Sequence, residues 1–346
     1  MLATRFGIVR TVMGGGALYT VGLVIVALSE SGGMLTLGNA LAGGAIGVAG
    51  FSAVFGAVGQ AAPPEKRTMV LAITAAGGSL GQFSVVPFGH VMFELFGWRV
   101  AMLILAALAS TIVLFALGLR RPATQGSAAG SGGPVQSTRA ALAEAFGHRG
   151  YVLLTIGFFV CGFHVAFVGT HMPNFLADKA VAVSILGREL SPAALGALSV
   201  AVIGLFNIVG TLAAGFVGGA VARKDALVAI YAARAAIIVY LLLAPIGGTS
   251  ILVFSMVFGL LYLSTVPITS GLIGYLFGPT HMGTLYGFVF FSHQLGGFLG
   301  AWGGGYLFDR TGSYDIMWWA SAALGVFAAL VHWPIVEKPV ARAVAA

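Results

Sequence analysis

The sequence predicts an all-helical integral membrane protein. Its mean hydropathy is +1.00, and only 8% of its 346 residues are charged while 59% are hydrophobic. A soluble domain carries roughly a quarter charged residues, so a chain this apolar cannot hide its side chains in one water-soluble core. We therefore expect a lipid bilayer to be its solvent. The 52 glycines fit this prediction, because small residues let helices pack closely in lipid.

Ten mostly apolar stretches are long enough to cross the hydrocarbon core, which takes roughly 20 helical residues at about 1.5 Å of rise each. In chain order they are residues 8–28, 35–57, 69–95, 100–119, 152–175, 193–221, 226–245, 251–276, 284–308 and 316–333. The first stretch follows Arg5 and Arg10 and is longer than the apolar part of a signal peptide, so we expect it to remain as a helix. The fourth ends at Arg120, where a longer polar segment begins.

This polar segment, residues 120–149, divides the predicted helices into four and six. Its run SAAGSGG at 127–133 and the following Pro134 have the composition of a flexible linker. The predicted organisation is a four-helix N-terminal bundle at 1–119, a linker at 120–149 and a six-helix C-terminal bundle at 150–346.

The basic residues predict how the helices are oriented, because short cytoplasmic loops collect Lys and Arg. With a cytoplasmic N-terminus and alternating helices, 12 Lys and Arg residues fall on the cytoplasmic side and 4 on the other, with Arg234 inside a helix. Both termini and the linker are then cytoplasmic. The sequence pI near 9.8 follows from these loops, so we expect no nucleic-acid partner.

Two segments 215 residues apart are copies of each other, and internal repeats are typical of secondary transporters. LGQF at 80–83 matches LGGF at 295–298, and at the same offset Gly97 matches Gly312. The copies lie on the third and ninth predicted helices, so the repeat is six helices long. We therefore expect a 6 + 6 arrangement whose N-terminal bundle is incomplete here, lacking its first two helices through a misplaced start or a degraded gene.

A 6 + 6 arrangement with a cytoplasmic linker resembles the major facilitator superfamily, and several short motifs carry this resemblance. They are Arg5-Phe6-Gly7 with Arg10, Pro63-Pro64-Glu65-Lys66-Arg67, Gly97-Trp98-Arg99, and Gly218-Gly219 with Arg223-Lys224-Asp225. The resemblance makes the ten helices family helices 3–12. It also implies a conformational-loop motif, present in two copies, formed by Arg5, Gly7, Arg10, Arg223 and Lys224. Ala3 stands where the family usually has an acidic residue.

Within the superfamily, four segments are similar to bacterial members of the monocarboxylate and oxalate/formate-like branch. They are residues 158–164, 169–173, 291–296 and 309–314. This resemblance implies a transporter of small organic anions, often moved with protons, in the bacterial cytoplasmic membrane. The chain departs from the branch at family helix 8. Transporters of this branch commonly place an arginine there, whereas stretch 193–221 is uncharged and has Asn207 as its main polar group.

Three histidines inside predicted spans are candidates for the substrate and proton path, because polar groups in lipid are costly. His164 and His171 lie two turns apart on one helix face, about 10 Å from each other, and His293 lies beside Gln294. Imidazole, with an unperturbed pKa of about 6.5, suits proton exchange. The alternative is a neutral histidine that bridges two helices. No nearby Cys or carboxylate completes a metal-ligand set, so we expect no metal.

Further polar residues within the spans extend this candidate path. Asn207, Gln82 and Thr265 form a mild polar set, and Pro267 breaks family helix 10 near its centre, either as a gating bend or as a static kink. Arg234 lies about eight residues from the cytoplasmic start of its helix, from where its side chain can reach out to the membrane surface, and we expect a structural role for it.

The function predicted from these features is secondary active transport of a small solute by alternating access, with an organic anion as substrate and the bilayer as surroundings. No catalytic constellation or Walker loop is present in the sequence, so neither an enzyme nor a cofactor is expected. Two alternatives stay open: a non-transporting truncated fragment of such a transporter, and a complete ten-helix exporter of the drug/metabolite type.

Overall fold

The computed structural model describes residues 6–119, 136–179, 183–185 and 188–340, and almost all of them are helical. Within these residues, nine segments are long and apolar enough to cross a membrane, and they coincide with nine of the ten predicted stretches. The tenth, 284–308, lies in the 30-residue helix α12 (Met282–Thr311). Its many glycines, with His293 and Gln294, make α12 less apolar, and it packs along α7.

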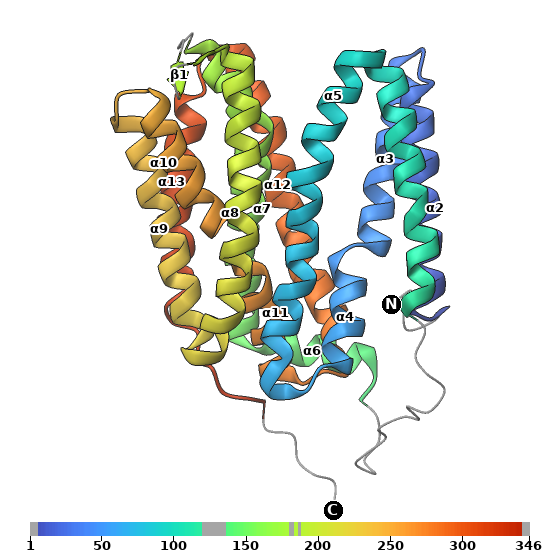
Figure 1. Cartoon of the computed structure of the whole chain (residues 1–346). Coiled ribbons are helices and arrows are strands. Elements are labelled where there is room, and N and C mark those ends of the chain that lie inside the picture. Colours follow the sequence, from blue (N-terminus) through green and yellow to red (C-terminus); the bar gives the residue numbers. More distant parts are fainter. Residues whose placement is uncertain (1–5, 120–135, 180–182, 186–187, 341–346) are drawn as a thin grey trace, which may run out of the picture.

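The first part of the chain consists of helices joined by short breaks (Figure 1), two of which fall at glycines. They are α2 (Ile8–Ala27), α3 (Gly32–Ala49), α4 (Phe51–Ala61), η1 (Pro64–Lys66), α5 (Arg67–Phe115) and η2 (Ala116–Leu119). The predicted stretch 35–57 is broken at Gly50, between α3 and α4. Helix α5 combines two predicted stretches, which meet at a kink where Gly97 has φ of 76°.

The second part begins with a helix inside the predicted linker and continues with the predicted spans. Its elements are α6 (Thr138–Gly147), α7 (Arg149–Asp178), β1 (Val183–Ile185), β2 (Arg188–Leu190), α8 (Pro192–Ala220), α9 (Arg223–Leu243), α10 (Gly248–Leu261), α11 (Thr265–Phe277), α12 and α13 (Asp315–His332). Strands β1 and β2 form an antiparallel hairpin that the sequence did not predict. The glycine- and serine-rich run at 127–133 lies outside the described residues.

The two parts meet along a small set of helices. Helix α5 contacts α8 and α11, and α4 contacts α12, while α2, α3 and the second arm of α5 lie on the far side of the molecule from α9 and α13 (Figure 1). Glycines permit the close α5–α8 contact: a Cβ added at Gly204 would lie 3.4 Å from Phe83 Cα, and one at Gly215 would lie 2.6 Å from Ala72 Cβ. The division into bundles at 119 and 150 stays a prediction.

The internal repeat has a counterpart in backbone geometry. Gly97 and Gly312, which are matched at the offset of 215 residues, both have positive φ, at 76° and 67°. Each ends one of the copied helical segments. An L-residue with a side chain rarely adopts a positive φ, so both matched positions favour glycine, although ψ is 165° at Gly97 and 14° at Gly312.

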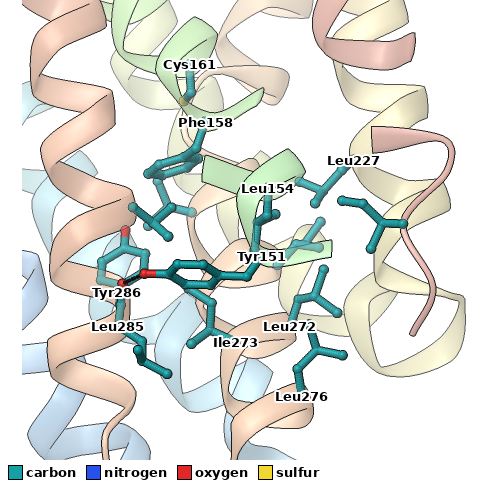
Figure 2. Packing of buried hydrophobic residues seen from close by; sticks show 14 of the residues in the cluster. Tyr151, Leu154, Phe158, Cys161, Leu227, Leu272, Ile273, Leu276, Leu285 and Tyr286 are labelled. Atoms are coloured by element: carbon teal, nitrogen blue, oxygen red, sulfur yellow. Dashed lines mark hydrogen bonds between the residues drawn. The ribbon is translucent and has the colours of Figure 1, made fainter. Parts of the chain in front are cut away.

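The core of the second part lies among α7, α9, α11 and α12 (Figure 2). Tyr151 is fully buried, and its hydroxyl donates a hydrogen bond to the Leu285 carbonyl at 2.8 Å. Phe158 and Cys161 continue this core toward the middle of α7. The same core therefore places the only cysteine of the chain in the centre of a membrane span.

Candidate functional site

The candidate site forms at the break between α10 and α11, in the middle of the predicted stretch 251–276. Pro267 has no N–H to donate to the carbonyl of Leu263 one turn earlier, so the regular helix cannot pass through. Helix α10 ends at Leu261 and α11 begins at Thr265. The backbone groups freed at the break need partners, because no water is available in the hydrocarbon core.

Arg234 of α9 supplies partners for the freed carbonyls. Its Nε and Nη2 donate to the Leu261 carbonyl at 3.0 and 2.5 Å, and Nη2 also donates to the Tyr262 carbonyl at 2.6 Å. The guanidinium carbon lies 5.2 Å from the centre of the Tyr231 ring, a cation–π distance. A cation is also favoured at the C-terminal end of a helix, here that of α10.

The expectation that the Arg234 side chain can reach the membrane surface is wrong. The residue is fully buried and points inward, because the two free carbonyls at the break bind the guanidinium inside the bundle. The sequence contained the signal for this arrangement, since Pro267 requires that nearby carbonyls find donors. It did not show that Arg234 of another helix would be the donor.

Asn207 of α8 holds the other side of the break. Its Oδ1 accepts hydrogen bonds from the Leu263 N–H at 3.0 Å and from the Thr211 hydroxyl at 3.1 Å. Asn207 is fully buried. The break is therefore clamped by an acceptor from α8 and a donor from α9.

The positive charge at the break has no acidic partner among the described residues. The ion pairs within the described residues involve Lys179, Arg223 and Lys224, which lie at helix ends and not at the break. Arg234 Nη1 is buried and makes no hydrogen bond within the described residues. An arginine is always protonated in proteins, so the site has the sign that attracts an anion.

Cys161, Thr265 and His293 come together next to this charge. The Cys161 sulfur lies 3.1 Å from the Thr265 hydroxyl oxygen, and the side chain of His293 lies beside the thiol. The His293 ring is packed 5.1 Å from Phe158 and 5.1 Å from Phe290. Its Nε2 is buried without a hydrogen-bond partner in the described part of the chain. Two of the sequence candidates, Thr265 and His293, thus join a cysteine that the sequence did not single out.

His164 and His171 are each bonded to a neighbouring helix instead. His164 Nε2 donates to the Ser321 carbonyl of α13 at 2.8 Å, and His171 Nε2 donates to the Ala301 carbonyl of α12 at 2.7 Å. His164 is fully buried and His171 nearly so. These contacts match the alternative of histidines that bridge helices.

The two glutamines lie at the edges of the site. Gln294 is exposed on α12, where its Oε1 accepts a hydrogen bond from His293 Nδ1 at 3.1 Å. Gln82 of α5 is half-buried and reaches the Tyr262 hydroxyl, which in turn donates to the Val165 carbonyl at 2.9 Å. Gln82 is therefore the candidate that connects the first part of the chain to the break.

The conformational-loop residues lie away from this site. Gly7 precedes α2 with φ of 82°, and Arg10 is exposed, while Arg5 lies outside the described residues. Arg223 forms an ion pair with Glu337 at 3.5 Å, and the Lys224 backbone N–H donates to the same carboxylate at 2.5 Å. This second copy of the motif therefore holds the segment after α13, through an acidic partner that the sequence did not indicate.

The described residues contain no group of three or more His, Cys, Asp or Glu side chains that could hold a metal ion. A cavity of about 470 Å³ lies between the two arms of α5, but its lining is apolar, with Phe93 and Met102 among its residues. The polar groups at the α10–α11 break are not among the residues that line this cavity.

Comparisons with known proteins agree on one family. The family model described as "Major Facilitator Superfamily" matches residues 1–301. Monocarboxylate transporter 13 of Bos taurus is 27% identical over 348 aligned positions, which cover 99% of this chain and 78% of the relative. An uncharacterized MFS-type transporter of Bacillus subtilis (strain 168), YcxA, is 29% identical over 167 positions, covering 47% of this chain and 38% of the relative.

Solved structures share the fold at low sequence identity. The fucose:proton symporter FucP of E. coli has a TM-score of 0.68 and 15% identity, with 97% of this chain and 86% of that chain covered. The proton:xylose symporter XylE has a TM-score of 0.69 and 17% identity, with 98% and 82% covered.

Proposed function

This chain belongs to the Major Facilitator Superfamily, and from that premise we propose that it moves a small organic anion, such as a monocarboxylate, together with protons by alternating access. Its membership makes it a multi-pass membrane transporter rather than an enzyme. The family match also excludes the alternative of a ten-helix exporter of the drug/metabolite type. The substrate class, the proton and the direction are the parts that we propose.

The observation that carries the proposal is the buried guanidinium of Arg234. An ionised group inside a membrane span is costly and therefore marks a substrate or ion path by default. Arg234 forms no ion pair among the described residues, and its Nη1 is unbonded there. An organic anion would neutralise this charge, with Thr265 and His293 as further polar groups.

The names of the relatives support both halves of the proposal. Monocarboxylate transporters 13 of Bos taurus and Rattus norvegicus align over nearly the whole chain, at 27% and 26% identity. The symporters of similar fold are described as proton-coupled. Sugars, which those two symporters carry by name, are neutral and would form no ion pair with Arg234.

The place of the protein in the cell is also a proposal. The distribution of Lys and Arg supports cytoplasmic termini, and similarity to a Bacillus subtilis transporter supports a bacterial cytoplasmic membrane. The chain spans 78% and 75% of the length of the two monocarboxylate transporters 13.

The test is uptake into proteoliposomes that contain the full chain. Labelled lactate, pyruvate and acetate are offered with fucose and xylose as neutral comparisons, with and without a pH gradient, acidic outside. We expect the gradient to drive accumulation of at least one monocarboxylate and of neither sugar. Accumulation of a sugar alone, or uptake that ignores the gradient for every anion, would contradict the proposal.

Arg234 is tested in the same system. Arg234→Gln should reduce anion uptake roughly tenfold to a hundredfold, which corresponds to the ~1.5–3 kcal/mol of a hydrogen bond to a charged group. Arg234→Lys keeps the charge but not the planar fork, so an intermediate rate is expected. Arg310→Gln, at the end of α12 against the Tyr306 ring, is the matched control and should transport normally. Thermal unfolding in detergent establishes that each variant is folded.

A further inference from the structure

Cys161 lies beside the unpaired charge of Arg234 and has no role in the proposal so far. We propose that Cys161 is the anionic partner of Arg234 in the substrate-free protein and takes up the coupled proton when an organic anion replaces it. This inference rests on the proposed function, because it names the group that exchanges the proton.

The Cys161 thiol of α7 and the Arg234 guanidinium of α9 both contact the break between α10 and α11. Arg234 binds the carbonyls of Leu261 and Tyr262, the last residue of α10 and the first residue of the break. Cys161 contacts Thr265, the first residue of α11, at 3.1 Å. The guanidinium carbon lies 5.2 Å from the centre of the Tyr231 ring. Cys161 is fully buried at the upper end of the cluster in Figure 2, one turn beyond Phe158.

Charge balance favours a thiolate here. A buried charge whose partner is missing is strongly unfavourable, and arginine does not give up its proton. In this proposal, a protein group that can become an anion supplies the balance when no substrate is bound. Free thiols ionise at a pKa of about 8.5 and phenols at about 10, so among the neighbouring groups the thiol loses its proton first.

The surroundings of Cys161 contain donors for a thiolate and no described carboxylate. The titratable and charged groups around it are Arg234 and Tyr231 of α9, Tyr262 at the break, and Tyr286 and His293 of α12. Thr265 can donate its hydroxyl proton to sulfur at the observed distance. His293, whose Nδ1 donates to Gln294, also lies beside the thiol. A hydrogen-bond donor such as Thr265 stabilises a thiolate.

The exchange conserves charge and atoms. One proton adds to a lone pair of the Cys161 sulfur and forms the S–H bond, while no other bond breaks. The carboxylate of the substrate then takes the place of the thiolate beside Arg234. The site is neutral before and after the exchange, so one anion enters with one proton. On release, the thiol returns its proton and again balances the guanidinium.

The protonation state can be read directly because the chain has one cysteine. The S–H stretching band in the infrared spectrum of the purified full chain reports Cys161 alone. We expect no S–H band at neutral pH without substrate, and a band that grows as lactate, or whichever monocarboxylate is transported, is added. In Arg234→Gln the band should be present without any substrate. An S–H band in the substrate-free native protein at neutral pH would overturn the proposal.

Transport measurements separate this inference from the proposed function. Cys161→Ser keeps the contact with Thr265 but does not ionise in the physiological range. It should still exchange labelled for unlabelled anion in counterflow and should lose accumulation driven by a pH gradient. Thr155→Ala on the same helix, whose hydroxyl bonds only to the Tyr151 carbonyl of its own helix, is the matched control and should keep both activities.

The remaining outcomes decide between the two statements. If the native protein moves no anion, the proposed function fails, whereas the infrared result still reports on the thiol and guanidinium. If folded Cys161→Ser accumulates anion normally, the proposed function stands and the role of Cys161 is refuted. Loss of counterflow in folded Cys161→Ser would make the thiol a substrate contact and would equally refute it. If His293→Gln loses accumulation driven by the pH gradient while Cys161→Ser keeps it, the imidazole of His293 carries the coupled proton and the role of Cys161 is refuted.

Discussion

At the scale of single residues, several of the largest buried polar side chains bond to backbone carbonyls outside their own helix, whereas hydroxyls such as those of Ser199 and Ser321 bond within their own helix. His164, His171 and Arg234 each donate to a carbonyl on a neighbouring element. The reason is general: a donor inside a membrane must be satisfied within the protein. Polarity within a span therefore does not by itself distinguish a transport residue from a helix–helix bridge, and the unbonded atoms carry more information.

A prediction at this scale concerns His164. Replacing it with Leu removes the hydrogen bond to the Ser321 carbonyl, and we expect a loss of ~0.5–1.5 kcal/mol in stability with uptake driven by a pH gradient preserved. Thermal unfolding in detergent and proteoliposome uptake are the two measurements. Normal stability combined with lost proton coupling in His164→Leu would restore the proton role expected from the sequence.

At the scale of helix pairs, glycines determine how closely two helices pack. One asparagine, Asn207, holds the break between α10 and α11. Helices α7 and α12 are in contact because a Cβ at Gly162 would lie 1.7 Å from the His293 carbonyl oxygen, and one at Gly296 would lie 2.0 Å from that of Phe159. The same contact holds His293 against the α7 turn that bears Cys161. Close packing of these two helices is thus a condition for the site.

We therefore predict that Gly162→Ala forces α7 and α12 apart. Overpacking of this kind costs ~1–3 kcal/mol, visible as a lower midpoint of thermal unfolding, and transport should fall with it. Gly77→Ala is the matched control, because a Cβ there would meet nothing within 4 Å and should be neutral or slightly stabilising. Equal midpoints for the two variants would contradict the packing argument.

A second prediction for the elements concerns the α10–α11 break. Asn207→Ala leaves the Leu263 N–H and the Thr211 hydroxyl without their acceptor, and an unsatisfied buried donor costs ~1–3 kcal/mol. The control is Asn39→Ala, since Asn39 is exposed and donates only to the Leu35 carbonyl of its own helix. Hydrogen exchange read by mass spectrometry should show faster exchange around 261–265 in Asn207→Ala and no change there in Asn39→Ala. Unchanged exchange in both would mean that Asn207 does not hold the break.

At the scale of the whole molecule, the two parts of the chain touch through α5 with α8 and α11 and through α4 with α12. Alternating access requires that such contacts open on one side of the membrane while others close. In the α5–α8 contact, the bare backbone at Gly204 lies against Phe83 of α5. Gln82 at the Tyr262 hydroxyl links this contact to the break.

This arrangement predicts a cross-link between the two parts. A Cβ at Gly204 would lie 3.6 Å from Phe83 Cβ, within the ~3.5–4.5 Å typical of disulfides. Phe83→Cys with Gly204→Cys should therefore form a disulfide on mild oxidation and stop transport until reduced. Cleavage at a protease site inserted at 127–133 makes the bond visible on a gel, and each single variant is the control. A cross-linked protein that transports normally would show that α5 and α8 do not separate during transport.

The sequence alone determined the class of the protein and the position of nine spans that the described structure contains. These follow from hydropathy and span length, which are local features of the chain, whereas the family was predicted from the resemblance of short motifs and of the 6 + 6 arrangement. Proton and anion candidates were also readable as polar residues within spans, and Thr265 and His293 among them do lie next to each other around Cys161.

Only the tertiary structure decided where those side chains point. Helical periodicity places a residue on a face, but which neighbour that face meets depends on how all helices pack. For this reason Arg234 turned inward to the free carbonyls of Leu261 and Tyr262 instead of outward to the membrane surface. For the same reason Cys161, inconspicuous in an apolar run, came to lie beside the buried positive charge.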